Sequence, residues 1–184
     1  MRVIAGTAGS LPLKTVPGIS TRPTADKIKE TLFNILAPQI PGAVFLDLFS
    51  GSGGIGIEAL SRGASKCVFV DNDPRAAACI EENLKFTKLA EKALVLRKNA
   101  LSAIGGLSAG HGRFDIVYMD PPYFEGLEEE TLRALIKSKT ADKESLIILE
   151  ASRKNPLSFT DGLGLVLTRE KLYKTNKHCF FRIR

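Results

Sequence analysis

The feature that most constrains this chain is a glycine-rich segment at residues 47–56, which reads DLFSGSGGIG. Residues 43–46, just before it, are apolar and of the length expected for a short buried strand. The residues after it fit the apolar face of a helix that ends near Gly63: Ile55, Ile57, Ala59 and Leu60. Glycine permits positive φ angles and lets a ligand approach the backbone, and a helix N-terminus carries partial positive charge. The segment therefore predicts a strand, a ligand-binding turn and a helix.

The glycine spacing alone does not name the ligand, because nicotinamide, flavin and S-adenosylmethionine (SAM) sites share it. Asp71 ends the next apolar run, about 20 residues on, where a ribose-binding carboxylate is expected in either cofactor class. Asp47 lies just before the glycines. Its carboxylate would repel a pyrophosphate and attract the ammonium group of a bound amino acid, which favours SAM.

Charge is concentrated at the two ends of the chain. The net charge is +6, with an excess of basic residues in 1–42 and 165–184 and a slight acidic excess between them. A polyanionic partner is the natural inference, with solvated surface charge as the alternative. No apolar run is long enough to span a membrane and none resembles a signal peptide, so we expect a cytoplasmic protein. The three scattered cysteines and two histidines predict neither a zinc site nor a disulfide.

The order of apolar runs predicts an α/β fold. Strands are expected at 43–46, 66–71, 93–96, 114–119 and 145–150, with helices after Asp73 and at 127–139. Residues 165–174 and 178–184 predict an antiparallel hairpin at the edge of a Rossmann-like, doubly wound, mostly parallel sheet. Before residue 41 we expect a small β-arm, with strands at 2–5 and 11–16, and a helix at 25–36 capped by Thr24. The predicted domains are 1–40, an appendage on the RNA and cofactor side, and 41–184.

The fourth strand leads into Asp120, Pro121, Pro122 and Tyr123. Ligands of open α/β sheets bind beyond the carboxyl ends of strands, so these residues are expected beside the glycine turn. Two prolines remove two N–H donors and leave the carboxylate and nearby carbonyls as acceptors. Acceptors and a stacking ring suit the exocyclic amine of a nucleobase, whose delocalised lone pair must be localised and aligned before it can attack a methyl carbon.

These residues resemble class I SAM-dependent methyltransferases that modify amino groups. More narrowly, the chain resembles the RsmD family of small-subunit rRNA guanine-N2 methyltransferases, nearly end to end. The resemblance rests on residues 2–6, 21–27, 32–34, 47–53, 57–64 and 120–123. It implies methyl transfer to guanine N2 of 16S rRNA at a guanine 966-type site. It also implies a substrate within a ribosomal particle, no metal and a monomeric enzyme.

The same resemblance implies residue roles. Catalysis would use Asp120, Pro121, Pro122 and Tyr123. SAM would be held by Asp47, Phe49, Ser50, Gly51, Ser52, Gly53, Asp71, Asn72, Asn99 and Ala100. RNA would be held by Arg2, Lys14, Arg22, Pro23, Thr24, Lys27, Tyr123, Lys174 and Lys177. The sequence has Asn99 where the family usually has aspartate, and residues 173–178 match the family pattern loosely.

Two other functions fit the same motifs. An adenine-N6 methyltransferase acting on DNA or RNA shares the Asp-Pro-Pro-Tyr motif, although no separate target-recognition domain is visible for sequence-specific DNA binding. A module that binds SAM and RNA without catalysis is the second alternative.

Overall fold

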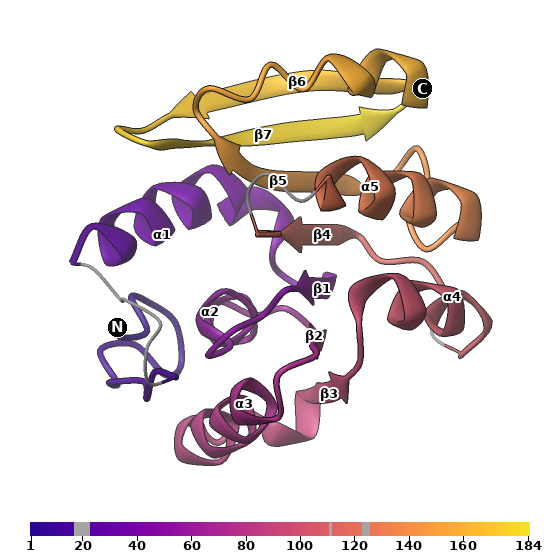
Figure 1. Ribbon diagram of the computed structural model, residues 1–184. Helices are drawn as coiled ribbons and strands as arrows, with labels where there is room; N and C mark the ends of the chain where they lie inside the picture. Colours follow the sequence, from indigo (N-terminus) through magenta and orange to yellow (C-terminus); the bar gives the residue numbers. More distant parts are fainter. Residues whose placement is uncertain (17–22, 111, 123–125) are drawn as a thin grey trace.

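In the computed structural model, the strands of the described residues form one sheet in the order β3-β2-β1-β4-β5-β7-β6 (Figure 1). The structure describes residues 1–16, 23–110, 112–122 and 126–184, with the backbone alone at 23–25 and 108–109. The first five strands are parallel, and β7 runs antiparallel to both β5 and β6. The strands are β1 (Val44–Leu48), β2 (Lys66–Asp71), β3 (Ala93–Arg97), β4 (Ile116–Met119), β5 (Leu146–Ser152), β6 (Leu165–Leu172) and β7 (Asn176–Ile183).

Helices cover both faces of the sheet (Figure 1). The helices are α1 (Pro23–Leu36), α2 (Gly54–Ser61), α3 (Pro74–Thr87), α4 (Ala100–Gly110) and α5 (Leu127–Ser138), with short 3-10 turns η1 (Ala37–Gln39), η2 (Ala90–Lys92) and η3 (Ser158–Leu163). Residues of α1, α2 and α3 share one apolar cluster with alternate strand residues such as Phe45 and Phe69. Residues of α4 and α5 share the other, with Leu46 and Val68. The predicted doubly wound sheet with an antiparallel C-terminal hairpin is confirmed.

The N-terminal arm differs from the prediction. Residues 2–5 and 11–16 do not form strands and meet in a single antiparallel bridge between Arg2 and Pro12. Around this bridge the two segments still pair through backbone hydrogen bonds from Val3 to Leu11, from Ser10 to Val3 and from Leu13 to Met1. The arm also binds α2, because the Glu58 carboxylate accepts hydrogen bonds from the backbone N–H groups of Ile4 (2.7 Å) and Ala5 (3.0 Å). Arm residues also belong to the same apolar cluster as α1 and α2, so residues 1–40 share a core with the rest of the chain.

Helix α4 is the element that the sequence analysis missed. It contains Gly105 and Gly106 and has little contrast between its faces, so its helical period is weak. Ala103, Ile104 and Leu107 nevertheless bury against the sheet. The burial of these side chains outweighs the poor intrinsic propensity of the glycines.

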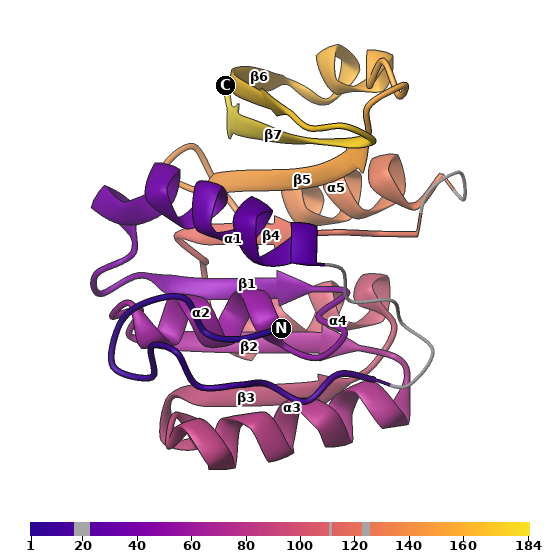
Figure 2. The ribbon, with the colours of Figure 1, turned by 90° about the vertical axis from the view of Figure 1, so that its left-hand side faces the viewer.

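The edge of the sheet at the carboxyl ends of the parallel strands gathers several segments (Figure 2). The start of α1, the start of α2 and the turn between β6 and β7 all lie at this edge. The motifs predicted to carry chemistry end these strands: Asp47 on β1, Asp71 on β2 and Asp120 after β4. The fold therefore brings together residues that are far apart in the sequence.

Candidate active site

The glycine turn between β1 and α2 has the backbone conformation that its sequence predicts. Gly51 has φ 55° and Gly53 has φ 79°, both in the left-handed region. A Cβ atom on Gly53 would lie 3.1 Å from the side chain of Ile80, so this glycine lets the turn pack on α3. A Cβ atom on Gly51 would meet nothing within 4 Å. The turn therefore packs closely against α3 at Gly53, whereas the space beside the Gly51 backbone is open.

Asp47 lies beneath this turn and is 1% exposed. Its Oδ2 accepts a hydrogen bond from the backbone N–H of Gly56 at 2.9 Å, in the first turn of α2. Burial raises the pKa of the Asp47 carboxyl to about 7; the Gly56 hydrogen bond opposes the rise, and the charge of Asp71 adds to it. A buried carboxylate that gains charge near neutral pH is suited to pairing with a bound cation.

Asp71 fixes the far side of the turn. Its two carboxylate oxygens accept hydrogen bonds from the backbone N–H groups of Gly51 (2.8 Å) and Asp73 (2.9 Å). Ser50 ties β1 to β2, because its hydroxyl donates to the Asp47 carbonyl (2.6 Å) and accepts from the Val70 N–H (2.9 Å). The turn is held in place by its own backbone and by the two strands that flank it.

The remaining predicted cofactor residues lie at the same edge with different exposures. Ser52 and Ala100 are buried, Phe49 is partly buried, and Asn72 and Asn99 are exposed. Asn99 has a structural role that the sequence analysis did not anticipate: its Oδ1 accepts from the Leu101 N–H at 2.9 Å and so caps the start of α4. The Asn99 side chain is therefore oriented by the helix that it begins.

Asp120 lies directly after β4, on the strand next to β1. Its side chain is reached by solvent, Pro121 is buried and Pro122 is exposed. Tyr123 falls outside the described residues. The protein around Asp120 removes part of its hydration, and the negative charges of Glu150 and Asp47 add to that effect, so its pKa lies well above the ordinary value of 3.8. The fold therefore favours the protonated form of Asp120 more than water does.

A polar cluster beside Asp120 was not predicted from the sequence. Glu150, on β5, accepts hydrogen bonds from the Tyr118 hydroxyl (2.7 Å) and the Asn176 amide (2.5 Å), and His178 Nε2 lies 3.0 Å from its Oε2. The Tyr173 hydroxyl lies 3.4 Å from His178 Nδ1. The one available signal was that Glu150 ends the strand following the Asp120 strand, since parallel strands end at the same edge.

The predicted RNA residues divide by accessibility. Lys27 and Lys174 are exposed at the edge described above, whereas Lys14 pairs with Glu82 at 2.7 Å. Arg2 is exposed, 3.8 Å from Asp26. Lys177 is 7% exposed and its Nζ lies 2.9 Å from Glu170, so the structure places it away from the surface. Arg22 falls outside the described residues, and Pro23 and Thr24 are described only as backbone in α1.

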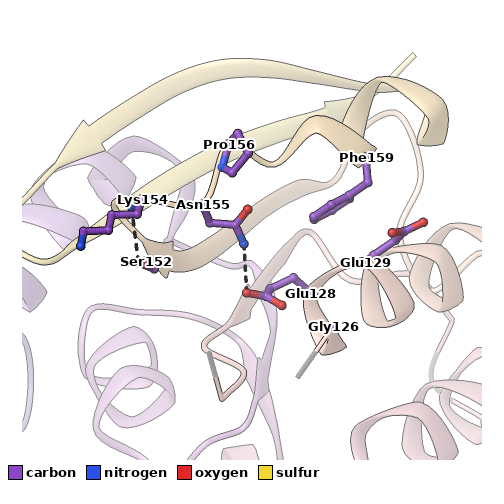
Figure 3. Close-up of a pocket in the computed structure, with 8 residues that line it drawn as sticks. All are labelled: Gly126, Glu128, Glu129, Ser152, Lys154, Asn155, Pro156 and Phe159. Carbon is purple, nitrogen blue, oxygen red and sulfur yellow. Dashed lines mark hydrogen bonds between the residues drawn. The ribbon is translucent and has the colours of Figure 1, made fainter. Parts of the chain in front are cut away.

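A hollow of about 390 Å³ lies between the start of α5 and the segment after β5 (Figure 3). Asn155 crosses its floor: its amide donates to Glu128 at 3.3 Å, while its Oδ1 accepts from the Leu157 N–H at 3.0 Å. The ring of Phe159 faces the hollow. Its lining includes none of the residues that the sequence analysis assigned to SAM or RNA.

Among the described residues, no group of three histidine, cysteine, aspartate or glutamate side chains could hold a metal ion. No helix of the described part is long and apolar enough to cross a bilayer.

The open backbone at Gly51, the buried Asp47 carboxylate and the Asp71 carboxylate fit the donors of SAM, which carries an ammonium group and ribose hydroxyls. SMU.776, described as a methyltransferase and solved in complex with SAH, has the same fold, with a TM-score of 0.68 at 16% identity over 84% of this chain and 49% of that one. The fold and the site define a class I methyltransferase, a class whose cofactor is SAM.

The relatives narrow this class. A family model described as conserved hypothetical protein 95 matches residues 1–182. Ribosomal RNA small subunit methyltransferase D of Escherichia coli (strain K12) is 39% identical over 174 residues, covering 94% of this chain and 84% of the relative. The E. coli protein yhhF has a TM-score of 0.84 at 34% identity, covering 100% of this chain and 98% of that one. The chain belongs to the RsmD family.

Proposed function

We propose that this protein transfers a methyl group from SAM to the exocyclic N2 of a guanine in small-subunit rRNA, at a site of the guanine-966 type. The observation that carries the proposal is the juxtaposition of two strand ends. Asp47 lies near the end of β1 and the glycine turn follows it, and Asp120 with its two prolines follows β4, which is paired directly with β1. A methyl donor at the first and an amine at the second would lie next to each other.

The chain's own groups supply acceptors for the target amine. SAM, when bound, supplies a methyl carbon on a positively charged sulfur. The Asp120 carboxylate and the Pro121 carbonyl would hold the two N–H groups of the amine, which draws the nitrogen lone pair out of conjugation with the ring. Proline at 121 and 122 leaves no backbone N–H to compete for these acceptors. Stacking of the base on Tyr123 stays part of the proposal.

Substrate class rests on the relatives and on charge. Relatives from E. coli and Haemophilus influenzae are named ribosomal RNA small subunit methyltransferase D. We extend that substrate to this chain, place the reaction in the cytoplasm and expect a monomeric enzyme acting on a partly or fully assembled ribosomal particle. Lys27 and Lys174 would bind phosphates beside the strand ends.

Methyl transfer to rRNA tests the proposal directly. Labelled SAM is incubated with small-subunit rRNA, or with particles that lack the modification, and the product nucleosides are separated. We expect N2-methylguanosine. N6-methyladenosine would replace the proposal by the adenine-N6 alternative, and SAM binding without transfer to any of these substrates would favour the non-catalytic alternative.

Removing the two exposed lysines tests the RNA surface. In the double variant Lys27→Ala/Lys174→Ala, the slope of log affinity for rRNA against log salt should become shallower by roughly 0.7 per lysine, because each phosphate contact releases counterions. Filter binding from low to moderate salt measures the slope. The control is Lys92→Ala/Lys137→Ala, two exposed lysines of η2 and α5. Equal slopes for the two double variants would contradict the assignment.

Asn99 offers a matched test of cofactor binding. Aspartate at this position keeps the cap on α4 and adds the charge that the family usually has there. We expect Asn99→Asp to tighten SAH binding several-fold by calorimetry, since a charged acceptor binds the adenine amine more strongly than an amide does. Asn34→Asp, at an exposed asparagine of α1 that is not assigned to the cofactor, is the control for the added charge. Unchanged affinity in Asn99→Asp would remove the adenine contact from the proposal.

A further inference from the structure

Asp120 and Glu150 lie side by side on one face of the sheet. The register pairs Tyr118 with Ile148 and Met119 with Leu149, so Asp120 and Glu150 are the next residues on the two parallel strands. Side chains alternate between faces, which puts both carboxyls on the face of Tyr118. The hydrogen bond from the Tyr118 hydroxyl to Glu150 at 2.7 Å shows that Glu150 is on that face.

Glu150 is held rigidly by groups from two other strands. Tyr118 donates from β4, and Asn176 and His178 donate from β7. Because a carboxylate only accepts, His178 donates from Nε2, and the Tyr173 hydroxyl lies 3.4 Å from its Nδ1. The rings of Tyr118 and Tyr173 both contact His178 edge to face, with centroids 6.0 and 5.1 Å away. The Glu150 side chain is only 15% exposed.

The two carboxyls therefore have opposite environments. Burial alone would raise the pKa of Glu150, but the hydrogen bonds and charge of His178, together with Tyr118 and Asn176, outweigh it, and its pKa lies below the ordinary value of 4.5. The pKa of Asp120 lies well above 3.8 because of lost hydration and the charges of Glu150 and of Asp47 from β1. Neighbouring carboxyls with pKa values driven apart divide the work of acid and base between them.

We propose that Glu150 is a positioning residue for methyl transfer: clamped in its ionised form, it makes Asp120 the group that takes up the proton released by the amine. This inference rests on the proposed function. As the N–CH3 bond forms from the nitrogen lone pair, the S–CH3 electron pair stays on sulfur, and the nitrogen becomes positively charged. An N–H proton then moves to an Asp120 oxygen. The sulfonium charge and the Asp120 charge both disappear, so the step balances.

Carboxyl-carbon NMR of the protein without substrate tests the electrostatic part. In Glu150→Gln, we expect the titration midpoint of Asp120 to fall by about one pH unit, since a neighbouring negative charge is lost while an oxygen acceptor for Tyr118 and His178 is kept. Glu170→Gln, the same change at a carboxylate that pairs with Lys177, should leave the midpoint of Asp120 unchanged. A fall below about 0.2 units in Glu150→Gln would overturn the proposal.

The pH profile of kcat tests the catalytic part. In Glu150→Gln, the acid limb should move to lower pH with Asp120, and the plateau should fall roughly threefold or more because Asp120 is a weaker base. If Glu150→Gln lowers kcat but leaves the acid limb of its pH profile at the wild-type pH, Glu150 has a structural role only. If Glu150→Gln does not fold, titration of the wild type decides: coincident midpoints, or Glu150 above Asp120, would contradict the division. None of these measurements depends on which base is methylated, so the proposed function can fail separately.

Discussion

Replacing Asp120 with alanine should lower kcat for methyl transfer by about 10²–10³-fold, the usual effect of losing one preorganised group that stabilises the transition state. By the proposal, the variant loses the acceptor that would hold the amine and the base that would take its proton. Cofactor affinity should change less than about threefold, because the turn at Gly51 and the carboxylates of Asp47 and Asp71 are untouched. The initial rate of methyl transfer from labelled SAM measures the change in kcat, and calorimetry with SAH measures the change in cofactor affinity.

The stability of the Asp120→Ala variant should not fall. The Asp120 side chain is reached by solvent, and its raised pKa shows that the folded protein disfavours its charge. Asp161→Ala, at an exposed aspartate in η3, controls for the loss of a surface carboxylate and should retain full activity. Full methyl transfer by Asp120→Ala would exclude it from catalysis, whereas a large loss of SAH affinity would move it to the cofactor site.

Much of the fold follows from the sequence because its signals are local. The apolar run before Asp47, the glycines after it and the later strand-helix alternation each report on a few neighbouring residues. Parallel strands then bring Asp47, Asp71 and Asp120 to one edge whatever their separation in sequence. For this reason the sequence predicts that the candidate cofactor residues Asp47 and Asp71 lie at the same edge of the sheet as Asp120.

The parts that could not be inferred depend on contacts between distant elements. Glu58 looks like an ordinary helical residue, yet it is buried, binds the N-terminal arm and lies 2.7 Å from Arg62 and 3.4 Å from Lys29. That contact anchors the arm to α2, while the two arm segments pair with each other only around the single Arg2–Pro12 bridge. Similarly, His178 contacts Glu150 only because β7 lies antiparallel between β5 and β6. The sequences of β5 and β7 do not indicate that pairing register. Helix α4 depends on burial against a sheet assembled elsewhere.

Replacing Asp47 with asparagine should stabilise the cofactor-free protein at pH 8 and weaken cofactor binding. The carboxyl has its ordinary pKa of 3.8 when exposed and a pKa of about 7 in the fold. The folded state therefore holds the proton more tightly, and the free energy of unfolding falls by about 1.4 kcal/mol per pH unit as pH rises between these values. Above pH 7 the loss is constant, on the order of 4 kcal/mol, and the neutral asparagine avoids it while its oxygen still accepts from Gly56.

Urea unfolding at pH 4 and pH 8 measures this effect, with the exposed Asp161→Asn as control. A gain of a few kcal/mol for Asp47→Asn at pH 8, shrinking toward zero at pH 4, is expected; an equal gain at both pH values would contradict a titrating carboxylate.

The affinity for SAH measures the expected effect of the same substitution on cofactor binding. In the wild type, binding should tighten from pH 6 to pH 8 as Asp47 ionises against the ammonium group, and Asp47→Asn should bind at least about tenfold more weakly at pH 8 with no such dependence. By the proposal, stability and cofactor binding would make opposite demands on one buried carboxylate, and the ammonium group of the cofactor would offset the cost of burying its charge.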